Sequence, residues 1–244
     1  MNTKEARALG EQAAALAAAG QQDEAHALLR PLLSARTPFR LLDVVGARLA
    51  EAPPQTVDPL LQRIAAEGQM GGWPVIGSAL GGRLKVNMPG AFAHCRDFTI
   101  QGDVWYATDI LGERISGPGL VTDFTQALSL LAPWRNDANR WVRRSLGVAV
   151  HLWAKRAHGD PGKTTQAEAL LAFLEPLFGE RDLDVVKGVG WGLKTLGRYY
   201  PDIQANWLRR QVFELERPHS RLMLRKALTY LPPDQRSCFP EPGT

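Results

Sequence analysis

Three tryptophans of the sequence each stand near charged residues at helical spacing. They are Trp105 with Asp109, Trp141 with Arg144, and Trp191 with Lys187, Lys194 and Arg198. Residues three, four or seven positions apart share one face of a helix. A core helix usually turns its indole away from its charges, so a shared face favours a surface that meets a ligand. A buried indole is the more common outcome for one tryptophan alone, and three pairings together weaken that alternative.

Aromatic faces beside Arg and Lys are suited to a nucleic-acid backbone. The cations neutralise phosphates, while indoles pack on sugars or bases. Residues 135–244 carry 18 basic and 12 acidic side chains, a net charge of +6, whereas residues 1–134 carry 11 and 13, a net charge of −2. This excess indicates a basic stripe for a polyanion. Charge alone also fits an ordinary solvated face.

The presence of Asp109 in a DNA-binding surface calls for an explanation, because a carboxylate repels DNA. One reason is chemistry on a sugar: cleavage of an N-glycosidic bond develops positive charge on the ribose ring, which a carboxylate stabilises while it orients water. The alternative is an ordinary ion pair of Asp109 with Arg114 or Arg144.

Apolar residues recur at the helical period through most of the chain, and strand signals are scarce. We predict an all-α protein in one domain, 1–244, built as an α-solenoid of degenerate HEAT-like helix pairs around a concave basic groove. The glycine-rich stretch 71–98 has poor periodicity, and we predict one helix there, over 73–84. The other predicted helices span 3–19, 23–33, 39–52, 57–67, 104–115, 119–131, 138–158, 165–178, 184–199, 203–216 and 220–231.

Four sequence blocks resemble a known family in order and spacing, over about residues 98–231. They are Val104-Trp105-Tyr106-Ala107-Thr108-Asp109, Asn139-Arg140-Trp141-Val142-Arg143-Arg144, Val186-Lys187-Gly188-Val189-Gly190-Trp191-Gly192-Leu193-Lys194, and the helix Ser220 to Leu231 with Arg225-Lys226-Ala227-Leu228. Each motif is weak alone, and jointly they are fairly specific. The chain resembles the HEAT-like-repeat alkylpurine DNA glycosylases, the AlkD-type DNA alkylation repair proteins.

The resemblance implies a DNA glycosylase that removes cationic N3- and N7-alkylated purines from duplex DNA without an enclosed base pocket. It implies that Asp109 is the catalytic carboxylate and that Trp105 and Trp191 pack against the deoxyribose. Arg144 would hold a backbone phosphate. The remaining expected DNA-binding residues are Arg143, Lys187, Lys194, Arg198, Arg225 and Lys226. A cationic base is already an activated leaving group, so no protonating acid is required.

Other features of the sequence bear on partners and location. No apolar run is long enough to span a bilayer, and the first twenty residues lack the apolar block of a signal peptide. Cys95 and Cys238 lie in no metal-binding motif. We expect a cytoplasmic monomer that binds double-stranded DNA with alkylated bases and needs no metal, cofactor or membrane. Two rival functions stay open: a non-catalytic binder of damaged or branched DNA, and a protein-binding helical scaffold.

Overall fold

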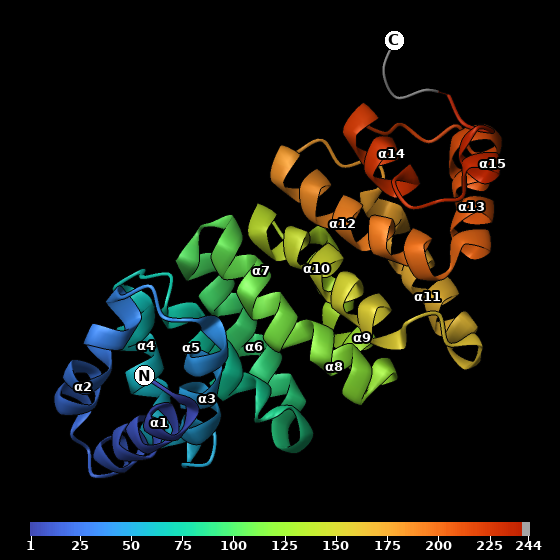
Figure 1. The fold of residues 1–244 in the computed structure, drawn as a ribbon. Helices are drawn as coiled ribbons and strands as arrows, with labels where there is room; N and C mark the ends of the chain where they lie inside the picture. Colours follow the sequence, from blue (N-terminus) through green and yellow to red (C-terminus); the bar gives the residue numbers. More distant parts are fainter. Residues whose placement is uncertain (241–244) are drawn as a thin grey trace. The chain divides into compact units, whose positions relative to one another are not determined.

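Helices account for the regular structure of the chain in a computed structural model, which describes residues 1–240 (Figure 1). No strand occurs in this range, so the predicted all-α class is confirmed. The α-helices are α1 (Thr3–Ala18), α2 (Gln22–Ser34), α3 (Phe39–Leu49), α4 (Pro54–Ala66), α5 (Gly72–Gly81), α6 (Leu84–Gly102), α7 (Trp105–Arg114), α8 (Ser116–Thr122), α9 (Phe124–Leu131), α10 (Arg140–Ala157), α11 (Thr164–Leu174), α12 (Leu183–Tyr199), α13 (Pro201–Arg209), α14 (Arg221–Leu228) and α15 (Pro233–Arg236). Short turns of other helix types are η1 (Ala132–Asn136), η2 (Pro161–Lys163), η3 (Glu175–Leu177) and η4 (Arg210–Glu214).

The first of two compact units, Met1–Ile115, contains two rows of helices. Helices α1, α3, α5 and α7 pack in succession, and α2, α4 and α6 form a second row behind them. Each helix buries an apolar face toward its neighbours, as in α3, where Leu42, Val45 and Leu49 are fully buried. This stacking places α7 at one end of the first row, against α5 and α6.

The glycine-rich stretch 71–98 forms two helices, so the prediction of a single helix over 73–84 was incomplete. Helix α5 ends at Gly81, and α6 follows with a bend at Asn87, whose backbone leaves the helical region. The glycines of α5 permit close helix packing: a Cβ on Gly77 would lie 2.8 Å from the Arg114 side chain, and one on Gly81 would lie 2.5 Å from the Arg114 carbonyl oxygen. Periodicity is poor here because α5 is buried on nearly all sides.

The second unit, Ser116–Thr244, repeats the two-row arrangement. Helices α8, α10, α12 and α14 pack in succession, with α9, η1, α11 and α13 in the second row (Figure 1). The predicted helix 119–131 is divided into α8 and α9, because Asp123 interrupts it and caps α9 through the Gln126 backbone N–H at 3.0 Å. Helix α12 lies between α10 and α14, and it carries Trp191, Lys194 and Arg198.

Candidate functional site

Trp105 is presented to solvent at the first residue of α7. Asp103 ends α6 in the left-handed conformation, with φ of 43°, and Val104 is extended, so the chain turns sharply between the helices. The Trp105 side chain is 54% exposed and meets the Tyr106 ring edge-on, with centroids 5.8 Å apart. An indole this exposed does not contribute the stabilisation that burial of its apolar area would give. Exposed apolar area of this kind is typical of a surface that contacts a ligand or partner.

Asp109 lies one turn after Trp105 on the same helix and is half-buried. Ala107, Thr108, Ile110, Leu111 and Gly112 are the buried residues of α7, whereas Trp105 and Asp109, four residues apart on one side of the helix, retain exposure to solvent. The structure thus places an exposed indole and a carboxylate along one face of α7, as the spacing predicts.

A network of charged and polar side chains fixes the end of α7. Arg114 donates from Nε and Nη2 to the two carboxylate oxygens of Asp43 on α3, at 2.6 and 3.1 Å. The Ser78 hydroxyl of α5 donates to the same carboxylate at 2.8 Å. Because Arg114 is mostly buried, this two-pronged ion pair orients α7 relative to α3 and α5.

Trp191 stacks on a histidine of the neighbouring helix. Its ring and that of His151 on α10 are 3.9 Å apart between centroids and 26° from parallel. His151 Nδ1 lies 2.7 Å from the Thr195 hydroxyl, which itself donates to the Trp191 carbonyl oxygen at 3.0 Å. Since the hydroxyl has one proton, Nδ1–H is the donor of the first bond. Burial, and then Lys155, lower the pKa of His151 to about 4, so the ring is neutral at pH 7.

Five predicted cations gather where α10, α12 and α14 meet. Burial is the largest cause that lowers the pKa of Lys226. The positive charges of four other residues lower it as well, in decreasing order Lys194, Arg144, Arg225 and Lys187. We call these five residues the Lys226 cluster. A group of like charges held this close stores repulsion that a bound polyanion relieves.

The members of the Lys226 cluster differ in how accessible they are. Lys187 is 47% exposed and lies 4.0 Å from the Asp184 carboxylate. Arg144 is only 6% exposed, and its Nη1 donates to the Asp184 backbone oxygen at 2.9 Å. Arg144 therefore holds the first turn of α12 to α10, and its expected phosphate contact stays a prediction.

Arg143 and Arg198, the other predicted DNA-binding residues, have different surroundings. Arg143 donates to the Glu180 carboxylate at 2.9 Å and to the Asp137 backbone oxygen at 2.7 Å, which fixes it within its own unit. Arg198 is exposed at the end of α12, with its guanidinium 5.3 Å from the centre of the Tyr230 ring. A role of either residue in DNA binding remains a prediction.

The shared-face interpretation was wrong for Trp141. This indole is 4% exposed and belongs to the core, although Arg140 covers its ring at 4.7 Å. The spacing of Trp141 and Arg144 does not lead to a solvent-facing surface, because both side chains are buried.

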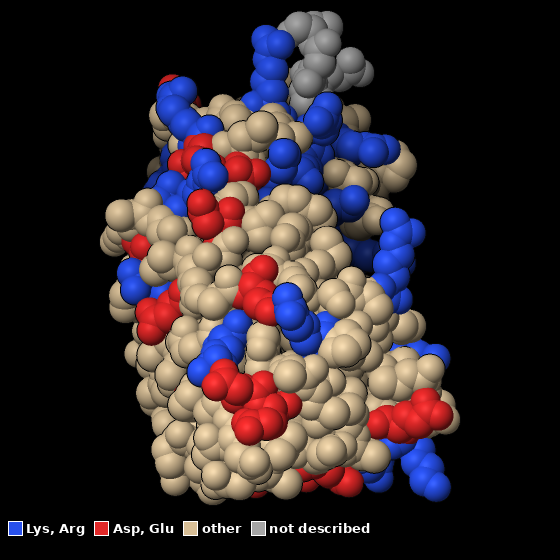
Figure 2. Space-filling model, turned by 90° about the vertical axis from the view of Figure 1, so that its left-hand side faces the viewer, with Lys and Arg blue, Asp and Glu red and all other residues tan. Residues whose placement is uncertain are grey.

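Acidic and basic side chains are interspersed on the face of the molecule drawn in Figure 2, where several red groups touch blue ones. Among residues 1–240, no three His, Cys, Asp or Glu side chains come together as metal ligands would, and no helix is long and apolar enough to cross a bilayer.

Residues 51–231 match the family model of the DNA alkylation repair enzymes. The chain belongs to this family. The match includes α7 with Trp105 and Asp109, and the Lys226 cluster. A search of the curated proteins finds no match. Membership of the DNA alkylation repair enzymes confirms the resemblance drawn from the sequence and indicates an enzyme that acts in the repair of alkylated DNA.

Sequence reasoning missed two residues that support the candidate site. His151 stacks on the Trp191 indole and Thr195 fixes the His151 ring, and neither belongs to the motifs that led to this family of DNA alkylation repair enzymes. The spacing of Thr195, four residues after Trp191, could have placed it on the same face. Nothing in the sequence links His151 to Trp191, because the contact joins two helices.

Proposed function

We propose that this chain is a DNA glycosylase that excises cationic N3- and N7-alkylated purines from duplex DNA. The observation that carries the proposal is the exposed indole of Trp105 one turn before the Asp109 carboxylate, within the segment that matches the repair family. Apolar surface is offered to solvent there, beside a group that stabilises positive charge.

The proposed reaction uses the charge that the lesion already carries. The bond between C1′ of the deoxyribose and N9 of the alkylated purine breaks, and its electron pair neutralises the positive charge of the departing base. The positive charge that develops on the sugar is stabilised by the Asp109 carboxylate, with Trp105 and Trp191 packed against the sugar. A water molecule then adds to C1′ and releases a proton, which leaves an abasic site. No step requires a general acid.

The Lys226 cluster supports a polyanionic partner. Its cations lie at the junction of three helices, and the pKa of Lys226 is lowered first by burial and then by repulsion from the other four. We propose that the exposed members neutralise DNA phosphates and that Arg144 adds positive potential from beneath them. We further propose that the helix rows form HEAT-like repeats with a basic groove in a single domain over 1–244, and that the protein is a cytoplasmic monomer independent of metal and cofactor.

Release of methylated base tests the proposal. Purified protein is incubated with duplex DNA that carries 7-methylguanine or 3-methyladenine, and the free base is quantified by chromatography. Asp109→Asn should reduce release at least about 100-fold, the usual scale for loss of a transition-state electrostatic contact. Asp97→Asn is the matched control, because Asp97 is a 64% exposed carboxylate of the same unit, on α6.

The outcomes separate the three functions. Release that falls only in Asp109→Asn supports the glycosylase. Equal release by wild type and Asp109→Asn removes this carboxylate from the mechanism. Binding to alkylated duplex without any release supports the non-catalytic binder, and failure to bind DNA even at low salt supports the protein scaffold.

A further inference from the structure

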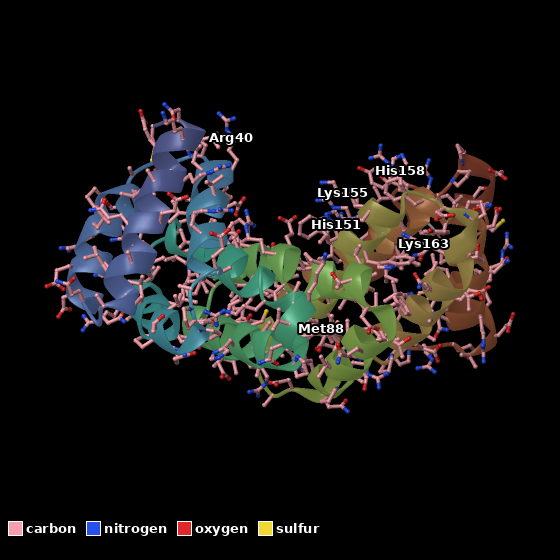
Figure 3. All side chains as sticks on the ribbon, turned by 90° about the horizontal axis from the view of Figure 1, so that it is seen from below. Arg40, Met88, His151, Lys155, His158 and Lys163 are labelled. Atoms are coloured by element: carbon pink, nitrogen blue, oxygen red, sulfur yellow. The ribbon has the colours of Figure 1, made fainter. Side chains whose placement is uncertain are left out.

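A small pocket beside Trp191 contains cations that the protein itself leaves without a counter-charge. The pocket has a volume of about 220 Å³ and lies along α10 and α12, with Tyr230, two residues after the end of α14, also lining it. Its lining residues are His151, Lys155, Trp191, Lys194, Thr195, Arg198, Tyr199 and Tyr230. His151 and Lys155 point to the same side of α10 (Figure 3). Three of the lining side chains are cations, and none is a carboxylate.

Within the part of the chain that the structure describes, the charge of these three cations is not compensated by an acidic side chain. Among residues 1–240, no carboxylate forms an ion pair with Lys155, Lys194 or Arg198. By contrast, Arg143 pairs with Glu180. Aromatic faces take the place of carboxylates at the pocket: Lys194 Nζ lies 4.7 Å from the centre of the Tyr230 ring, and the Arg198 guanidinium lies 5.6 Å from that of Tyr199.

Aromatic contact holds these cations in position but leaves their charge in place. His151 adds no charge, because its ring is neutral, and its Nδ1–H is bound to Thr195. An anion in the pocket therefore meets cations from two helices: Lys194 and Arg198 of α12, which the tyrosine rings position, and the exposed Lys155 of α10. A tetrahedral phosphate presents oxygens in several directions and meets this demand better than a planar carboxylate.

We propose that this pocket binds a single phosphate group, with Lys155, Lys194 and Arg198 as its charged ligands. Two sources share this chemistry: a phosphodiester of the DNA backbone and a small phosphate ion or monoester. The backbone is the source that the proposed function requires. Trp191 forms one wall of the pocket, and a sugar packed on this indole carries a phosphate on each side, one of which reaches the pocket. This identification of the source rests on the proposed function, whereas binding of phosphate itself does not.

Titration with inorganic phosphate tests the pocket in the full-length protein. The ring signals of the five histidines are followed by NMR at constant ionic strength, with chloride replaced by phosphate. We expect a saturable shift of the His151 signal in wild type, which is lost in Lys155→Gln and in Arg198→Gln. Arg156→Gln is the matched control, because Arg156 is an exposed cation adjacent to Lys155 and does not line the pocket. Its titration should equal that of wild type.

Binding of unmodified duplex DNA at several salt concentrations identifies the source. If the backbone occupies the pocket, Lys155→Gln reduces the slope of log K against log salt by about 1, and Arg156→Gln leaves it unchanged. A phosphate-dependent shift of His151 with an unchanged slope assigns the pocket to a small phosphate. The proposal is overturned if phosphate moves all five histidines equally and without saturation, whatever the slope does. Loss of base release in the glycosylase assay would leave a positive phosphate titration standing.

Discussion

Gly147→Ala should destabilise the protein, although alanine is the better helix former. A Cβ at position 147 of α10 would lie 2.5 Å from the Val189 Cα of α12, and closer still to the backbone carbon and oxygen of Gly188. Ordinary van der Waals contact begins at 3.4 Å, so relief of the Val189 contact alone requires α10 and α12 to separate locally by about 0.9 Å, and the nearer Gly188 atoms require more. The obstacles are backbone atoms, which no side-chain rotation can remove.

The expected magnitude follows from two opposing terms. Overpacking of a close interface costs roughly 1–3 kcal/mol, and a backbone clash belongs at the upper end, about 3 kcal/mol. Replacement of glycine by alanine within a helix returns about 1 kcal/mol. The free energy of unfolding should therefore fall by about 2 kcal/mol, which for a chain of this length lowers Tm by roughly 4–8 °C.

Thermal melts followed by circular dichroism measure this effect, with Gly197→Ala as the control. Gly197 lies on α12, and its nearest neighbours are 3.4 Å from a Cβ placed there, within ordinary contact. Gly197→Ala should leave Tm unchanged or raise it by helix propensity alone. A Tm for Gly147→Ala that equals or exceeds that of wild type would refute the argument that Gly147 is needed for the close approach of α10 and α12.

Two further predictions concern single side chains. The pKa of His151 is about 4 in the folded protein, against an ordinary value of 6.5, so the unfolded chain takes up this proton first as the pH falls. The free energy of unfolding should therefore decrease between pH 6.5 and pH 4, by less than about 1.4 kcal/mol per pH unit. Urea unfolding from pH 7 to pH 4 should show a smaller loss of stability in His151→Gln than in wild type, and equal losses would contradict the role of burial. Asp43→Asn removes the carboxylate that orients Arg114 and should lower the free energy of unfolding in urea by about 1.5–3 kcal/mol. The control Asp97→Asn should change it by less than about 0.5 kcal/mol. Similar values for both variants would show that the Asp43–Arg114 ion pair does not stabilise the fold.

The helices and the family were predictable because both depend on patterns of residues that are close together in the sequence. Thirteen or so residues at the helical period suffice to show an amphipathic face, and most predicted ranges match observed helices to within a few residues. Differences arise at ends, as at 165–178, where α11 stops at Leu174 and η3 continues. The family motifs are equally local, since Trp105 and Asp109 belong to one turn of one helix.

The role of the glycines in α12 is what local reasoning cannot supply. A helix with Gly188, Gly190 and Gly192 looks weakened by propensity alone. In the structure these positions are contact points: a Cβ on Gly190 would lie 2.5 Å from the Lys226 side chain, and one on Gly192 would lie 2.7 Å from the Gly147 carbonyl oxygen. The reason for each glycine is thus a partner on another helix, which periodicity within one helix cannot reveal.

The same limit explains why three similar tryptophan patterns had three outcomes. Spacing establishes which residues share a face, but the neighbouring helix decides whether that face meets solvent. Trp105 stands at the start of α7 and is exposed, Trp141 is buried, and Trp191 is half-covered by the ring of His151. The glycines of α12 bring it close to α10 and α14, so they also determine how near His151 comes to Trp191 and how near the cations come to Lys226. Substitutions that widen this packing should weaken phosphate binding as well as stability, without altering any charged residue.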